Sequence, residues 1–136
     1  MDRTIKFRGK EGDRWVYGDY VHDCYIVEQN NTGLFYVRKD TVGQYTALED
    51  ADGVEIYEGD IVTMMRAKNG KRKLKRVLHV VTCNHYAYDW VFKPIEDGYN
   101  PFMMVGQTDF DSCKFHVVGN IYDNPEMLNN GEEKKD

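Results

Sequence analysis

The sequence predicts a small, mainly β protein with a compact barrel in its second half. Aromatic residues make up 13% of the 136 residues and include ten tyrosines, and strands favour aromatic and β-branched side chains. Short apolar runs alternate with turn-forming clusters, and the first 62 residues show no helical period. A chain of this length can bury a core without disulfides.

The first half of the chain is expected to form short strands separated by clusters of Gly, Asp and Asn, which favour turns. The predicted strands are Ile5 to Arg8, Trp15 to Val21, Tyr25 to Glu28, Leu34 to Arg38, Val42 to Leu48, Glu55 to Tyr57 and Gly59 to Val62. A boundary is expected near residue 40. It separates an N-terminal β region, residues 1–40, from the barrel, residues 41–128.

A basic hairpin is predicted next, because Asn69-Gly70 is a preferred two-residue turn between apolar flanks. Residues 61–68 should then pair with residues 71–83, and the predicted opposing pairs are Lys68 with Lys71, Arg66 with Lys73 and Met64 with Lys75. Residues 66–76 contain seven cations and no acid. Since the whole chain carries a net charge of −5, the other residues carry −12.

The remaining elements are an aromatic strand, a loop and a closing segment. Residues 86–92 alternate strictly, and the side chains expected on one strand face are Tyr86, Tyr88, Trp90 and Phe92. Residues 94–112 are predicted to be a long loop, and residues 114–118 and 121–122 closing strands. Asn124-Pro125 predicts one short C-terminal helical turn. The polar tail, residues 129–136, is expected to be disordered.

Metal chemistry finds little support in the sequence. Neither Cys83-Asn84-His85 nor His22-Asp23-Cys24 has the C-x-x-C or H-x-x-x-H spacing that presents zinc ligands together. The acidic turn 50–53 does not fit a calcium loop, because Leu48 would fall at the first ligand position. We therefore predict a solvated hairpin turn there, with no metal and no cofactor.

Catalysis is not expected either. The sequence contains no G-x-S-x-G elbow and no phosphate-cradling glycine loop. We predict a non-enzymatic protein without catalytic residues, and an enzyme assembled from dispersed carboxylates and histidines is the least supported alternative.

The cysteines indicate a reducing compartment. Cys24, Cys83 and Cys113 are odd in number and widely spaced, unlike the disulfide framework of a small secreted domain. No signal peptide or membrane-spanning run is found. The expected location is the cytoplasm.

The basic hairpin has two interpretations. Its cations could contact nucleic-acid phosphate, and the residues concerned are Arg66, Lys68, Lys71, Lys73 and Lys75. A lysine-rich strand also protects an edge against aggregation, and the acidic remainder opposes general nucleic-acid affinity. The sequence leaves nucleic acid as the less favoured partner.

Several segments together resemble the YopX-like family of phage and prophage proteins. The segments that carry the resemblance are Ile5-Lys6-Phe7-Arg8-Gly9-Lys10, Trp15-Val16-Tyr17-Gly18-Asp19-Tyr20, Val42-Gly43-Gln44-Tyr45-Thr46, Asp52-Gly53-Val54-Glu55-Ile56-Tyr57-Glu58-Gly59-Asp60-Ile61-Val62 and Val117-Val118-Gly119-Asn120-Ile121-Tyr122-Asp123-Asn124-Pro125-Glu126. The hairpin tip, the aromatic strand and the following loop show no family pattern.

The resemblance implies a small N-terminal β region followed by an SH3-like barrel, with the hairpin 66–76 and the loop 94–112 as insertions, in a phage or prophage protein of a bacterial cell. It transfers no catalytic residue. The leading expectation is therefore an accessory protein that binds another protein, which includes a second copy of itself. Nucleic-acid binding by the hairpin is the alternative.

Overall fold

The regular elements in the described part of this chain are antiparallel strands and two short 3-10 helices. In this computed structural model the described residues are 5–22, 24–28, 33–68, 70–84, 89–104 and 114–129. The mainly β prediction is confirmed. The chain divides into two units, Met1–Ala47 and Leu48–Asp136, so the division lies at residue 47 where the sequence suggested residue 40. Among the described residues no helix is long and apolar enough to cross a membrane.

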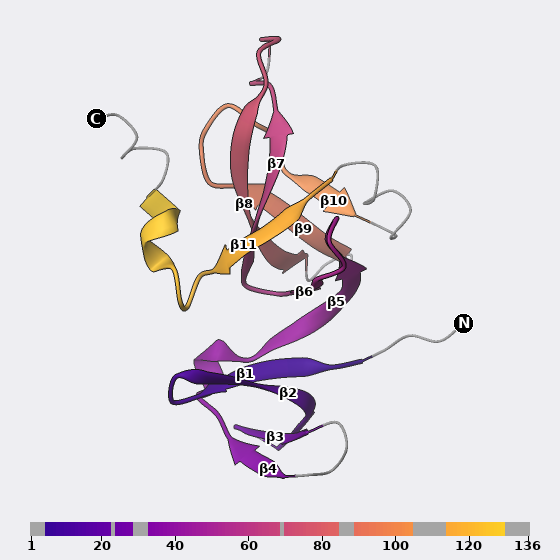
Figure 1. Ribbon diagram of the computed structural model, residues 1–136, viewed down its shortest axis with the longest axis vertical. Coiled ribbons are helices and arrows are strands. Elements are labelled where there is room, and N and C mark those ends of the chain that lie inside the picture. The colour runs from indigo at the N-terminus through magenta and orange to yellow at the C-terminus, as the bar shows by residue number, and fades with distance from the viewer. Residues whose placement is uncertain are drawn as a thin grey trace. The chain divides into compact units, whose positions relative to one another are not determined.

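The first unit is built on four strands: β1 (Phe7–Glu11), β2 (Arg14–Val21), β3 (Tyr25–Glu28) and β4 (Leu34–Tyr36). A short helix, η1 (Lys39–Thr41), leads to β5 (Gly43–Glu49), which crosses the division. The sheet order is β4-β3-β2-β1-β5-β6 (Figure 1). Val16 of β2, Ile26 of β3 and Val37, the residue after β4, form one buried cluster.

The second unit holds the remaining strands and the closing helix: β6 (Glu55–Tyr57), β7 (Asp60–Arg66), β8 (Lys75–Asn84), β9 (Asp89–Pro94), β10 (Phe102–Met104), β11 (His116–Asn120) and η2 (Pro125–Asn129). Five of these strands form a sheet in the order β10-β9-β8-β7-β11. Its core contains Val62, Val81, Phe92 and Phe115, and the two phenyl ring centroids lie 5.0 Å apart. The described ladders leave β10 and β11 as edges, so the barrel-like sheet is not closed.

Several predicted boundaries need correction. The expected loop 94–112 contains β10, and residues 121–122, expected in a strand, form a turn. Tyr86 and Tyr88 lie outside the described residues, as does the tail beyond Asn129. Phe92 is fully buried and Trp90 packs against the same cluster, so the alternation in this half of the aromatic strand indicated core packing.

The register of the basic hairpin differs from the prediction. Arg66 pairs with Lys75, and Met64 pairs with Val77, so the pairing is offset by two residues. The described residues 67–68 and 70–74 lie outside both strands. The offset places Met64 opposite an apolar partner, because burial of apolar residues decides strand register. It also avoids like-charged ladder pairs nearer the tip, which would destabilise the hairpin.

Asp50 joins the turn after β5 to the edge strand β11. Its carboxylate is buried, and its Oδ1 accepts the backbone N–H groups of Asp52 and Val54 at 2.8 and 2.9 Å. Its Oδ2 accepts the N–H of Val117 at 2.9 Å, and the N–H of Ala51 donates to the carbonyl of Phe115 at 2.9 Å. The sequence predicted a solvated hairpin turn here, but the Asp50 side chain is buried and hydrogen-bonded.

The glycine of the central motif serves backbone geometry. Gly59 has a φ of +94°, its N–H donates to the carbonyl of Val81 and its carbonyl accepts the N–H of Ile121, both at 2.9 Å. A Cβ here would lie 3.0 Å from the Tyr122 ring. The next residue, Asp60, accepts the N–H of Tyr57 at 2.7 Å. A left-handed bend with close neighbours on both sides requires glycine.

The closing motif is also structural. The Asn120 side-chain oxygen accepts the N–H groups of Tyr122 and Asp123 at 3.0 and 2.8 Å. The Asn124 side-chain oxygen accepts the N–H of Asn120 at 3.1 Å, and a Cβ at Gly119 would lie 2.5 Å from that oxygen. These contacts fix the turn that leads into η2.

We expect Asp50→Asn to destabilise the protein by about 2–3 kcal/mol, because an amide N–H₂ would face one of the three N–H donors and leave it unsatisfied. Urea unfolding would measure the change. The matched control is Asp52→Asn, whose side chain is 72% exposed. Equal effects of the two substitutions would contradict the role assigned to Asp50.

Candidate functional site

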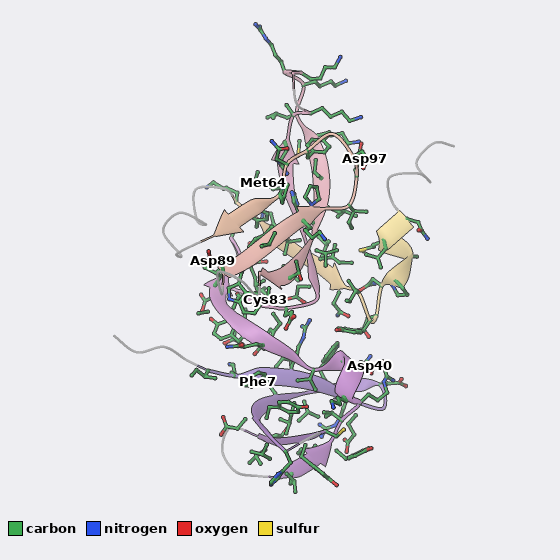
Figure 2. All side chains as sticks on the ribbon, turned by 180° about the vertical axis from the view of Figure 1, so that it is seen from behind. Phe7, Asp40, Met64, Cys83, Asp89 and Asp97 are labelled. Carbon is green, nitrogen blue, oxygen red and sulfur yellow. The ribbon has the colours of Figure 1, made fainter. Side chains whose placement is uncertain are left out.

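The basic pocket is a cavity of about 390 Å³ in the second unit, lined by Lys68, Lys71, Lys73, Lys75 and Tyr99. All four lysines are exposed. They come from the connection between β7 and β8 and from the first residue of β8, whereas Tyr99 comes from the segment after β9. Figure 2 shows long nitrogen-tipped side chains projecting from this hairpin. Four of the five predicted cations thus line one cavity.

Arg66, the fifth predicted cation, is fixed beside the basic pocket. Its Nη1 lies 3.0 Å from Nε2 of His79, and its guanidinium carbon lies 5.2 Å from the Tyr99 ring centroid. Partial burial lowers the pKa of Arg66 below its ordinary value. A planar guanidinium already held by these two contacts loses less freedom when it binds an anion.

His79 is the neutral partner of this arginine. Its side chain is fully buried and contacts the Phe115 ring edge to face, with centroids 5.6 Å apart. Burial first, and the charge of Arg66 second, lower the pKa of His79 to about 4. Because Arg can only donate, His79 Nε2 must accept, which places the imidazole proton on Nδ1 at neutral pH.

Glu96 holds two of the pocket lysines. Its Oε1 and Oε2 lie 3.0 Å and 3.1 Å from Nζ of Lys75, and Oε2 lies 3.9 Å from Nζ of Lys68. The hydrogen bond from Lys75 raises the pKa of that lysine. Gly98, with a φ of +101°, lets the Lys68 stem lie close, because a Cβ there would be 3.1 Å from it.

The charge of the basic pocket suits an anion. The lysines supply mobile charges, and Arg66 supplies a fixed fork of donors suited to phosphate or carboxylate. Tyr99 is only 8% exposed and carries Arg66 over its ring, so it forms a floor and no open stacking platform. Exposed lysines gathered around one cavity are chemically suited to a polyanion.

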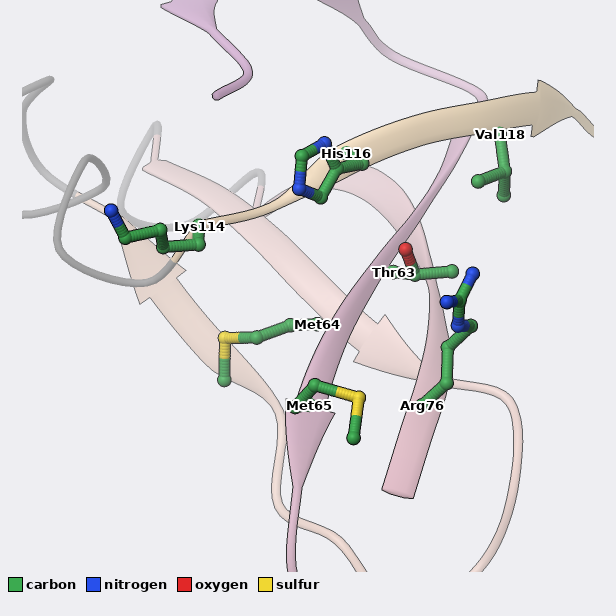
Figure 3. A pocket seen from close by; sticks show the side chains of 7 residues that line it. All are labelled: Thr63, Met64, Met65, Arg76, Lys114, His116 and Val118. Atoms are coloured by element: carbon green, nitrogen blue, oxygen red, sulfur yellow. The ribbon is translucent and has the colours of Figure 1, made fainter. Parts of the chain in front are cut away.

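A second cavity, of about 430 Å³, lies beside β7, β8 and β11. It is lined by Thr63, Met64, Met65, Arg76, Lys114, His116 and Val118 (Figure 3). His116 pairs with Asp52 at 3.1 Å. The lining mixes apolar and basic side chains. It does not gather several side chains of one charge, as the basic pocket does.

The metal hypothesis gains no strong site. Asp50, Asp52 and His116 bring possible ligand atoms within 4.8 Å of one another, but the Asp50 carboxylate already accepts three backbone N–H groups. Burial raises the pKa of the Cys83 thiol, as do nearby Glu58 and Asp89, which disfavours a reactive thiolate. Residues 23, 85 and 113 lie outside the described part.

Sequence reasoning found the lysines but missed three residues that organise them. Glu96 and Tyr99 lay in a predicted loop, and His79 lay in a strand whose register was wrong. The ladder from β8 to β9 pairs His79 with Pro94, and the N–H of Ile95 donates to the carbonyl of Leu78 at 3.0 Å. This pairing brings residues 95–99 close to the hairpin. No local sequence motif predicts the pairing.

Two comparisons with known proteins match most of the chain. A family model described as YopX protein matches residues 6–129. The crystal structure of protein EF1440 from Enterococcus faecalis is similar, with a TM-score of 0.54 and 22% identity over 93% of this chain and 99% of that chain. That likeness shows the fold alone. No curated protein matches the chain significantly.

We expect the free energy of unfolding to fall as the pH is lowered from about 6.5 to 4. The folded pKa of His79, about 4, lies below its ordinary value, so the unfolded chain binds more protons in this window, and the loss approaches about 3 kcal/mol. Urea titrations between pH 7 and 4 would measure it. In His79→Gln this part of the slope should disappear, and an unchanged slope would contradict the assignment.

Proposed function

This chain belongs to the YopX family, and we propose that it is a non-enzymatic accessory protein that binds the phosphate backbone of nucleic acid through the basic pocket. We place it in the cytoplasm of a bacterial host, encoded by a phage or prophage. The observation that carries the proposal is the convergence of four lysines and an anchored arginine around one cavity.

Charge distribution supports binding at this site alone. The segment 66–76 carries seven cations, whereas the rest of the chain carries a net charge of −12. Phosphate would be repelled by most of the molecule and attracted at the hairpin, so the bound strand should contact the hairpin and little else. Contacts of this kind position a strand without reading its sequence.

The burial of Tyr99 favours contact with the phosphate backbone over recognition of bases. Its ring is covered by Arg66, so a base has no free aromatic face to stack on in the pocket, and stacking is what sequence-tolerant strand-binding proteins add to charge. We therefore expect affinity without sequence preference. Four lysine–phosphate contacts would weaken binding about a hundredfold between 50 and 200 mM salt on duplex DNA.

A second candidate function, self-association, is favoured by one apolar surface of the first unit. Tyr25 and Tyr36 pair across β3 and β4, with ring centroids 5.4 Å apart, and Leu34 lies on the same face two residues before Tyr36. Leu34 and Tyr36 are 60% and 63% exposed. Because β4 ends the sheet, a second copy could cover this face and pair with the free edge.

The double variant Lys71→Gln/Lys73→Gln should weaken binding of labelled DNA at least tenfold. It should also reduce the slope of log affinity against log salt concentration by the amount expected for about two lost phosphate contacts. Fluorescence anisotropy with single- and double-stranded DNA and RNA over a salt series would measure it. The control, Arg38→Gln/Lys93→Gln, removes the same charge from exposed positions outside the pocket. Equal losses would show non-specific attraction, and no binding by the intact protein at low salt would refute nucleic acid as the ligand.

Self-association should be lost in Leu34→Ser/Tyr36→Ser, since both changes remove exposed apolar area from the β4 face. Sedimentation velocity over a concentration series would detect a dimer of the unchanged protein. Val54→Ser/Leu128→Ser, at exposed apolar positions elsewhere, is the control. A protein that stays monomeric at high concentration would contradict this second candidate.

A further inference from the structure

We propose that Glu96 is an internal competitor for the ligand: its carboxylate occupies Lys68 and Lys75 in the free protein and makes the basic pocket selective for polyanions over single anions. This inference rests on the proposed function and adds a specificity-determining residue to the same site. It is carried by the position of one carboxylate against two lysines that line the cavity.

The contacts of Glu96 resemble those that a bound phosphate would make. Both of its oxygens lie within 3.1 Å of Lys75 Nζ, and one lies 3.9 Å from Lys68 Nζ. These are charge-assisted contacts to the same ammonium groups that an incoming anion needs. A ligand phosphate can therefore reach Lys75 fully only when it replaces the carboxylate.

The backbone holds Glu96 in this place. The preceding residue, Ile95, donates its N–H to the carbonyl of Leu78 in β8, and Gly98 allows the Lys68 stem to lie against the segment. The Glu96 side chain is only 20% exposed, whereas those of Lys68 and Lys75 are 49% and 53% exposed. The acid is thus fixed, and the lysines are the mobile partners.

Selectivity follows from what the ligand gains in exchange. A single small anion would take the place of the Glu96 carboxylate at Lys75, so one negative group would replace another with little net gain in binding. A polyanion also reaches Lys71 and Lys73, which line the same cavity but are not held by Glu96 in the described structure. The extra contacts offset the displaced carboxylate, so only a multivalent ligand binds well.

Removal of the competitor should strengthen binding. Glu96→Gln keeps the shape of the side chain and should tighten binding of a labelled 20-nucleotide single strand about three- to tenfold, the range expected for one or two partly exposed ion pairs. Inorganic phosphate, used as a competitor, should displace the strand from this variant at lower concentration than from the unchanged protein.

A neighbouring acid provides the matched control. Asp97→Asn removes the same charge from the next residue, which is exposed, and should change affinity less than twofold. In a Lys75→Gln background, Glu96→Gln should lose most of its effect, because its main partner is gone. Such a double-mutant cycle separates a specific contact from a general change in charge.

The outcomes distinguish this inference from the proposed function. If the unchanged protein binds the strand, and Glu96→Gln matches Asp97→Asn or acts equally in the Lys75→Gln background, internal competition is refuted and the binding function stands. If neither the unchanged protein nor Glu96→Gln binds at low salt, both proposals fail. Binding only after Glu96→Gln would support the competing role of this carboxylate but refute nucleic acid as a ligand of the unchanged protein.

Discussion

The Asp50 carboxylate is the contact on which the arrangement of the second unit depends. A hairpin turn and an edge strand meet there, and each brings backbone N–H groups that a ladder does not satisfy. One buried carboxylate accepts three of them, and charged acceptors form stronger hydrogen bonds than neutral ones. It joins β11 to the chain entering β6, where the described sheets show no ladder between them. The edge of an unclosed sheet is thereby covered.

The basic hairpin shows how a costly charge pattern can be accommodated. The observed register still sets Arg66 opposite Lys75, two like charges whose repulsion opposes pairing. Each has its own compensation: Arg66 donates to His79 and lies over Tyr99, and Lys75 contacts Glu96. Because the compensating groups come from the interior of β8 and the segment after β9, the same contacts that permit the hairpin also assemble the basic pocket.

The sequence predicted the fold class and most strands, since alternation and turn residues are local signals. It failed where partners are distant in the chain. The predicted turn does leave a trace, because the N–H of Lys71 donates to the carbonyl of Lys68 at 2.8 Å, but the choice of register depended on pairing Met64 with Val77. The lysines of the site could be named from charge alone. Glu96 could not, because only the pairing of β8 with β9 brings it to the hairpin.

The same contrast separates structural motifs from available chemistry. In Gly59-Asp60 and Gly119-Asn120 the polar side chains accept backbone N–H groups: Asp60 accepts that of Tyr57, and Asn120 accepts those of the turn that follows it. Their hydrogen-bonding capacity is used in holding the chain. The lysines of the basic pocket are exposed cations, and two of them contact Glu96. The motif residues have structural roles, so a test of binding should address the basic hairpin.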